Sequence, residues 1–224
     1  MEQMQNIITN DELIPSAHNH AKPVLSEAVF RPMLFSTEMV RALLNGLKTQ
    51  TRRVVKDNIL QNYRNENEET LDFIKVSMLD SIKPKIGDVI WVRETFSQKD
   101  ERLIYRSQVC SKWDLPDGFK WTPSLFMPKS VCRLFLEITN IRLERLNDIS
   151  DNDSISEGIE IIERLKAIRM FKDYNLKGTL VGKTTAIESY KSLWISINGQ
   201  KSWDDNPFVW AYTFKVVDCP YGFR

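Results

Sequence analysis

The stretch Gly46-Leu47-Lys48-Thr49-Gln50-Thr51-Arg52-Arg53 separates an amphipathic segment from a polar, β-branched run, and the interpretation of the whole chain starts from it. Before it, Ser36 is a suitable helix N-cap, and apolar residues from Met39 to Leu47 follow at helical spacing. Asn45-Gly46 predicts the end of this helix, because glycine accepts the left-handed conformation that follows a helix. The run from Lys48 to Val55 is then predicted to be a strand.

The remaining pattern is a mixture of strands and short helices. An Ile86-Gly87-Asp88 turn leads into a convincing strand, and Ser150 begins a short helix that ends near Gly158. A second amphipathic helix carries Ile187, Tyr190, Leu193, Trp194 and Ile197 and stops at Asn198-Gly199. The predicted strands are Phe30–Phe35, Val89–Phe96, Arg102–Ser107, Val131–Leu143 and Phe208–Val216. Because the helices do not alternate regularly with the strands, we expect an α+β domain around a small β-barrel.

Composition limits the class of protein. The chain has 224 residues, of which 42% are hydrophobic, so one domain with a substantial core is expected. A net charge of +1 excludes a globally basic protein that coats DNA. No apolar run approaches the roughly 18 residues of a membrane span, and the start of the chain lacks the pattern of a secretion signal. We therefore expect a cytoplasmic protein with no membrane partner.

Cysteine and histidine give no sign of a metal or a disulfide framework. Cys110, Cys132 and Cys219 are widely spaced and form no Cys-x-x-Cys pair, so buried free thiols are expected. The two histidines, His18 and His20, fall in the polar N-terminal arm and are expected to be exposed. Two ligands rarely hold zinc, so neither a metal site nor any other cofactor is predicted.

Charge is segregated along the chain although the total is nearly balanced. Between Arg41 and Lys56 there are five cations and no acid, whereas Glu144 to Glu163 holds seven acids and one arginine. The cations could meet phosphates or another anion. Alternatively, they form a solvated face that pairs with the acidic segment. Charge alone favours the second interpretation.

The spacing Gly46-x-Lys48-x-x-Thr51-x-Arg53 resembles the signature of the ASCH domain, a family of small β-barrels in the PUA-like superfamily. Other pieces agree in order: the Ile86-Gly87-Asp88 turn, Leu136-Glu137-Ile138-Thr139, the helix that ends in Glu157-Gly158, and the terminal aromatic strand. The combination is similar to ASCH-like proteins found in phage and prophage genomes.

The resemblance also implies a division of the chain. Residues 1–29 are expected to be a flexible arm, residues 30–218 a single ASCH-like domain, and residues 219–224 a tail. The resemblance covers about half of the chain, because small family members lack the stretches near 56–84, 97–130 and 160–183. These stretches are interpreted as insertions.

The family associates its motif with a cleft that recognises RNA or a modified base. One branch hydrolyses the amide of acetylated cytidine with a lysine, a threonine three residues later and a downstream glutamate, which correspond here to Lys48, Thr51 and Glu157. In that chemistry a neutral lysine activates the hydroxyl, and nearby cations favour the neutral form. Lys48 and Thr51 have opposite strand parity, so both line one cleft only if Lys48 sits in the turn after Gly46 or a bulge intervenes.

Two functions therefore have residues that support them, whereas a third, a structural or assembly role in a phage particle, has no sequence feature in its favour. The first is a cofactor-free amidohydrolase that removes an acyl group from the exocyclic amine of a modified pyrimidine. The second is a module that binds RNA, single-stranded DNA or a modified base without altering it. Its candidate binding residues are Gly46, Arg41, Lys48, Arg52, Arg53 and Lys56, with Trp91, Phe96 or Trp121 for base stacking.

Overall fold

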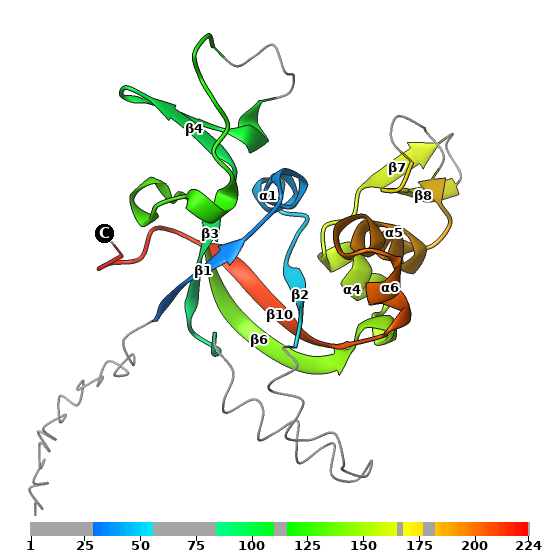
Figure 1. The fold of residues 1–224 in the computed structure, drawn as a ribbon. Helices are drawn as coiled ribbons and strands as arrows, with labels where there is room; N and C mark the ends of the chain where they lie inside the picture. The colour runs from blue at the N-terminus through cyan, green and yellow to red at the C-terminus, as the bar shows by residue number, and fades with distance from the viewer. Residues whose placement is uncertain (1–28, 56–83, 110–115, 165–167, 177–181, 224) are drawn as a thin grey trace, which may run out of the picture.

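The computed structural model describes residues 29–55, 84–109, 116–164, 168–176 and 182–223. Its main sheet has five strands in the order β1-β3-β6-β10-β2 (Figure 1). These are β1 Phe30–Leu34, β3 Val89–Arg93, β6 Phe135–Arg145, β10 Phe208–Val217 and β2 Gln50–Val54. β1 pairs with β3 in parallel and the other pairings are antiparallel. The mixed α+β class is confirmed. Over the described residues this sheet is open between β1 and β2, so closure into a barrel stays a prediction.

The helices predicted from capping residues and apolar spacing are present in the structure. Helix α1 spans Thr37–Leu44, and its N-cap Ser36 accepts a hydrogen bond from the Met39 N–H at 3.3 Å. Gly46 follows the helix with a φ of +68°. The other helices are α4 Asp151–Ser156, α5 Ala186–Asn198 and α6 Gln200–Asp204. Of these, α6 was not predicted. Among the described ranges, no helix combines the length and the apolarity needed to cross a membrane.

Three strand predictions need correction. The run Val89–Phe96 is interrupted after Arg93, because Phe96 leaves the main sheet and forms a bridge with Thr122. It begins β4 Phe96–Lys99, which pairs with β5 Arg102–Tyr105. The strand predicted over Arg102–Ser107 therefore ends at Tyr105, because a 3-10 turn begins at Arg106. β6 starts at Phe135 rather than Val131, because Lys129–Val131 forms a 3-10 turn after Pro128. The further 3-10 turns are η2 Arg106–Gln108, η4 Ser124–Phe126 and η6 Leu146–Asp148.

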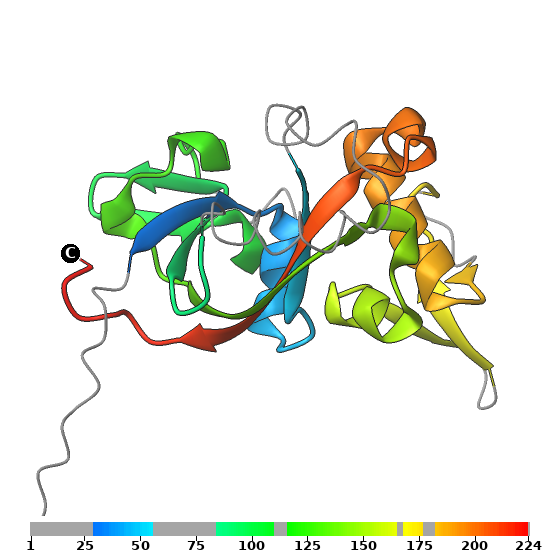
Figure 2. The same cartoon turned by 90° about the horizontal axis from the view of Figure 1, so that it is seen from below.

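The predicted insertions differ in what they contain. Residues 160–183 hold a small sheet of three strands, β7 Ile161–Arg164, β8 Ile168–Lys172 and β9 Gly182–Lys183. The stretch 97–130 contains the β4–β5 hairpin, whereas the arm and nearly all of 56–84 lie outside the described residues. Figure 2 shows the β4–β5 hairpin and helices α5 and α6 at opposite ends of the main sheet. The division into arm, domain and tail remains a prediction.

The alternating aromatic residues of β10 are explained by their packing in the core. Trp210, Tyr212 and Phe214 of β10 pack into the cluster beneath α1, whereas Val209 joins a cluster around α5. A third cluster receives Phe223, which is 1% exposed, so the end of the chain is anchored in the core. Trp91 belongs to this third cluster and is 9% exposed.

Candidate functional site

Lys48 lies in the turn between α1 and β2, before the regular strand begins. The N–H of Leu47 donates to the carbonyl of Ala42 at 2.9 Å, which keeps the turn on the end of α1. Lys48 forms an isolated antiparallel bridge with Glu157, 109 positions later in the chain. The turn therefore brings the predicted lysine to the predicted glutamate, but it does not place Lys48 among the residues that line the same pocket as Thr51.

The ammonium of Lys48 is buried and makes both of its hydrogen bonds to one residue. Lys48 Nζ donates to Glu157 Oε2 at 2.7 Å and to the backbone carbonyl of Glu157 at 2.8 Å. The exposed fractions of Lys48 and Glu157 are 2% and 4%. Burial lowers the pKa of Lys48, Glu157 opposes this shift, and the charges of Arg53 and Arg52 add to the lowering. The net direction favours a neutral amine relative to an ordinary lysine.

Arg52 connects the basic segment to the acidic one. Its guanidinium lies 2.7 Å from Glu144 Oε1, 3.1 Å from Asp153 Oδ2 and 3.1 Å from Glu157 Oε1. Arg142 also reaches Asp153, at 2.7 Å. The two segments of opposite charge thus do pair, but at Arg52 and Lys48 the pairing is buried rather than a solvated face. The carboxylates that surround Arg52 occupy the donors a phosphate would need.

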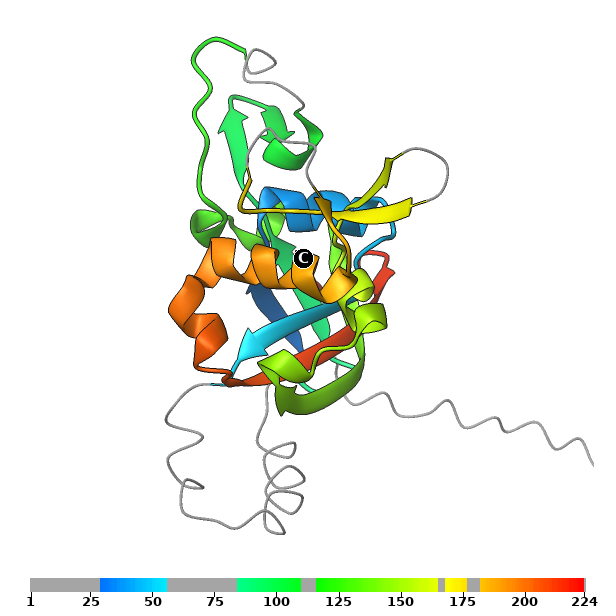
Figure 3. The same ribbon diagram turned by 90° about the vertical axis from the view of Figure 1, so that its right-hand side faces the viewer.

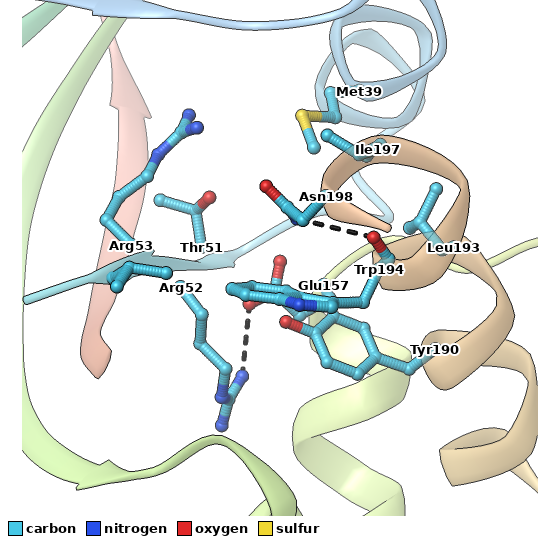
Figure 4. A pocket seen from close by; sticks show the side chains of 11 residues that line it. Met39, Thr51, Arg52, Arg53, Glu157, Tyr190, Leu193, Trp194, Ile197 and Asn198 are labelled. Carbon is cyan, nitrogen blue, oxygen red and sulfur yellow. Dashed lines mark hydrogen bonds and ion pairs between the residues drawn. The ribbon is translucent and has the colours of Figure 1, made fainter. Parts of the chain in front are cut away.

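A pocket of about 90 Å³ opens between β2 and α5. In the view of Figure 3, α5 lies between α1 above and β2 below. Thr51 and Arg53, two residues apart on β2, line one side, and Glu157 lies deeper (Figure 4). Tyr190 and Trp194 of α5 form an aromatic wall, with ring centroids 6.2 Å apart. Two of the three predicted catalytic side chains, Thr51 and Glu157, therefore line the same pocket.

A second hollow of about 220 Å³ adjoins the first and shares Met39, Glu157 and Leu193 with it. Arg41, Lys172 and Tyr174 are among its other lining residues. Glu157 therefore faces two spaces, and a ligand larger than the first pocket has room beside it.

Arg53 has few partners. Its Nη2 donates to the carbonyl of Leu34 at 2.6 Å, and its guanidinium carbon lies 5.3 Å from the centre of the Phe35 ring. Its Nε is buried and has no hydrogen-bond partner in the described structure. Burial lowers the pKa of Arg53, and Glu157 opposes that shift. Unlike Arg52, Arg53 keeps donors for a ligand.

The aromatic candidates differ from those expected. Trp91 and Phe96 are buried in the core, and Trp121 lies against Arg106 at 5.4 Å. None of the three lines the pocket, whose aromatic wall comes from Tyr190 and Trp194. Sequence reasoning identified these two residues only as the apolar stripe of a helix. The signal was present in their spacing of four, which puts both rings on one helix face.

The other predicted binding residues are not gathered at the pocket. Arg41 donates to the carbonyls of Ser107 and Val109 at 3.0 and 2.7 Å, which ties α1 to η2. Gly46 ends α1, and nothing lies within 4 Å of the position its Cβ would take. Lys56 lies outside the described residues.

The described residues contain no cluster of three or more His, Cys, Asp or Glu side chains that could hold a metal ion. His18, His20 and Cys110 lie outside this part of the chain. Cys132 is buried and free, as predicted, but Cys219 is free and exposed, so the expectation of burial is wrong there. Cys219 falls just after β10, where the chain runs along the surface before Phe223 enters the core.

Among known proteins, the chain is similar to a solved structure. No family model and no curated protein matches this chain. A solved structure, the ASCH domain from Lactobacillus crispatus JV V101, is similar to it at 14% sequence identity and a TM-score of 0.35, over 85% of this chain and 81% of that one.

Proposed function

We propose that this protein is an ASCH-like amidohydrolase that removes an acyl group from the exocyclic amine of a modified pyrimidine, with acetylated cytidine as the simplest substrate. The observation that carries the proposal is that Thr51 and Glu157 line one pocket while Glu157 accepts a hydrogen bond from the buried Lys48 at 2.7 Å. A hydroxyl, a carboxylate and an amine with a lowered pKa are the groups that cofactor-free amide hydrolysis requires.

In the proposed reaction the Thr51 hydroxyl attacks the acyl carbonyl carbon. Its proton passes through the carboxylate of Glu157, which lines the pocket, to the neutral form of Lys48, and then to the exocyclic nitrogen, which leaves as the amine when the C–N bond breaks. Water hydrolyses the resulting threonine ester, which releases the carboxylic acid and restores the hydroxyl. Glu157 holds Lys48 in place, and its negative charge limits how far the pKa of Lys48 falls.

The rest of the pocket supports binding of a flat ring with a carbonyl group. Tyr190 and Trp194 are 2% and 6% exposed and belong to the core cluster around α5, and the parts of their rings that line the pocket would contact a pyrimidine bound there. The guanidinium of Arg53, with donors left free, is suited to hold the oxyanion that develops during attack. The adjoining hollow gives the acyl or sugar part additional space.

Thr51 is the residue on which to test the proposal. Thr51→Val keeps the shape of the side chain and removes the hydroxyl, and Thr51→Ser keeps the hydroxyl. We expect Thr51→Val to reduce release of cytidine from acetylated cytidine, followed by liquid chromatography, by about 100-fold or more, and Thr51→Ser to retain measurable turnover. Equal turnover in wild type and Thr51→Val would refute the assignment of Thr51 as the nucleophile. Lys48→Ala is a poorer test, because it breaks a buried ion pair.

A non-catalytic module that binds a modified base, RNA or single-stranded DNA is the second candidate. It is favoured by the aromatic wall and the free donors of Arg53, which serve recognition without any reaction. Arg41 and Arg52 contribute less than the sequence suggested, because carbonyls and carboxylates occupy their donors. Under this alternative, Thr51→Val leaves ligand affinity nearly unchanged and no preparation releases cytidine.

A further inference from the structure

Arg53 and Arg93 share an unusual feature. In the described structure their Nε atoms are the two buried side-chain nitrogens or oxygens that have no hydrogen-bond partner. Each guanidinium instead donates once from Nη2 to a backbone carbonyl, Arg53 to Leu34 and Arg93 to Leu125. A buried hydrogen-bond donor without an acceptor lowers the stability of the folded protein, so each such group requires an explanation.

The two arginines are connected through one residue. Leu34 accepts the hydrogen bond of Arg53 and is the register partner of Arg93 in the β1–β3 pairing. Leu125 accepts the hydrogen bond of Arg93, and Phe126 follows it. These contacts form a series that begins at the pocket and connects Arg53, Leu34, Arg93, Leu125 and Phe126, and we call this set of residues the Arg53–Arg93 track.

The charge and exposure of the track residues indicate which kind of ligand could bind there. In the described structure no carboxylate pairs with Arg53 or Arg93, whereas Arg133 and Arg52 are both held by buried glutamates. Leu34, Leu125 and Phe126 are 41%, 56% and 67% exposed. Two guanidinium groups without a carboxylate partner, together with the exposed Phe126 that follows the Leu125 contacted by Arg93, match a ligand that has both anionic groups and flat rings.

We propose that the Arg53–Arg93 track binds the phosphodiester backbone of a single-stranded polynucleotide that extends from a base in the pocket, with a neighbouring base stacked on Phe126. The inference rests on the proposed function in so far as it takes the pocket as a base site. A mononucleotide carries its phosphate next to its own base, whereas the track continues past Arg93 to a second aromatic surface. The natural ligand is therefore a base within a strand rather than a free nucleoside.

The test is fluorescence anisotropy with short labelled oligocytidylates, as RNA and as DNA, over a range of salt concentrations, with cytidine monophosphate as the competing small ligand. We expect Arg93→Gln to weaken oligonucleotide binding about tenfold and to reduce the slope of log K against log salt by about 0.7. Arg93→Lys keeps the charge and should restore most of the slope. Phe126→Ser should weaken binding by about tenfold without changing the slope. Thermal melting of each variant verifies that it is folded.

The matched control is Arg145→Gln, which removes an arginine that stacks on Phe208 outside the track. Equal losses of oligonucleotide affinity in Arg145→Gln and Arg93→Gln would refute binding along the track. Wild-type affinity in folded Arg93→Gln and Phe126→Ser would also refute it. Displacement of the oligonucleotide by an equal concentration of cytidine monophosphate would refute it as well. Hydrolysis of free acetylated cytidine by wild type tests the pocket chemistry separately. Track-dependent binding without hydrolysis would therefore retain this inference while removing the amidohydrolase.

Discussion

Lys48 Nζ lies 2.7 Å from Glu157 Oε2 and 2.8 Å from the carbonyl oxygen of the same residue. Glu157 thus receives both hydrogen bonds of a buried ammonium, and its second carboxylate oxygen accepts from Arg52 at 3.1 Å. Since two cations share one buried carboxylate, loss of that carboxylate leaves both less well neutralised. The pair joins the turn after α1 to the end of α4, and Glu157 also lines the pocket.

Breaking this pair should destabilise the protein strongly. We expect Lys48→Met or Glu157→Gln each to lower the free energy of unfolding by about 3–5 kcal/mol, because each leaves a buried charge with fewer partners. The double variant should lose less than the sum of the two. Urea unfolding measures all three. Lys201→Met, at an exposed pair with Asp205, is the control and should change stability by less than about 0.5 kcal/mol. Additive losses would show that the two side chains are not coupled.

Asp153 should make stability depend on acidity. Burial raises the pKa of Asp153, but the hydrogen bond from Gln50 and the charges of Arg142 and Arg52 outweigh this, so the net effect is a pKa below that of an ordinary aspartate. A carboxyl with a lowered folded-state pKa stabilises the protein above its unfolded pKa, and this is lost as the pH falls through the folded value. Asp153→Asn should therefore cost about 1–3 kcal/mol near neutral pH and progressively less in acid.

Urea midpoints of wild type and Asp153→Asn over a pH series measure this difference. Asp205→Asn, at the exposed pair with Lys201, serves as the control and should show only a small difference. A gap between wild type and Asp153→Asn that stays constant down to strongly acidic pH would contradict the assignment.

Gly158 should tolerate no side chain. Its φ is +86°, and a Cβ there would lie 2.8 Å from both the Ala42 Cβ and the Lys48 Cβ. Gly46 also has a positive φ, +68°, but its Cβ would meet nothing within 4 Å. We expect Gly46→Ala to cost about 1–2 kcal/mol for the backbone alone, and Gly158→Ala about 2–5 kcal/mol because the clash adds to it. Chemical denaturation compares the two, and equal losses would refute the close contact.

The entrance of the pocket can be blocked without changing its polar residues. Ile197 lines the pocket and is 51% exposed, so Ile197→Trp places a larger ring where the pocket opens. We expect the affinity for acetylated cytidine, measured by calorimetry, to fall at least about tenfold. Leu44→Trp introduces the same ring at a position that is 47% exposed and does not line this pocket. If both variants bind like wild type, the ligand does not use this pocket.

Much of the secondary structure could be predicted because its signals are local. Ser36 and Ser150 cap helices within three residues of themselves, and Gly46 and Gly158 end them with positive φ. The small sheet at residues 160–183 was missed, because its short strands carry no clear alternation.

The sequence by itself determined the mixed α+β class, the capped helices and the residue types Lys48, Thr51 and Glu157 as candidates. Only the tertiary structure decided that Lys48 sits in a turn, that Arg52 is neutralised by three carboxylates, and that Tyr190 and Trp194 face Thr51. The reason is separation along the chain. A cap depends on atoms a few residues away, whereas Lys48 and Glu157 are 109 positions apart and meet only when the chain has folded around them.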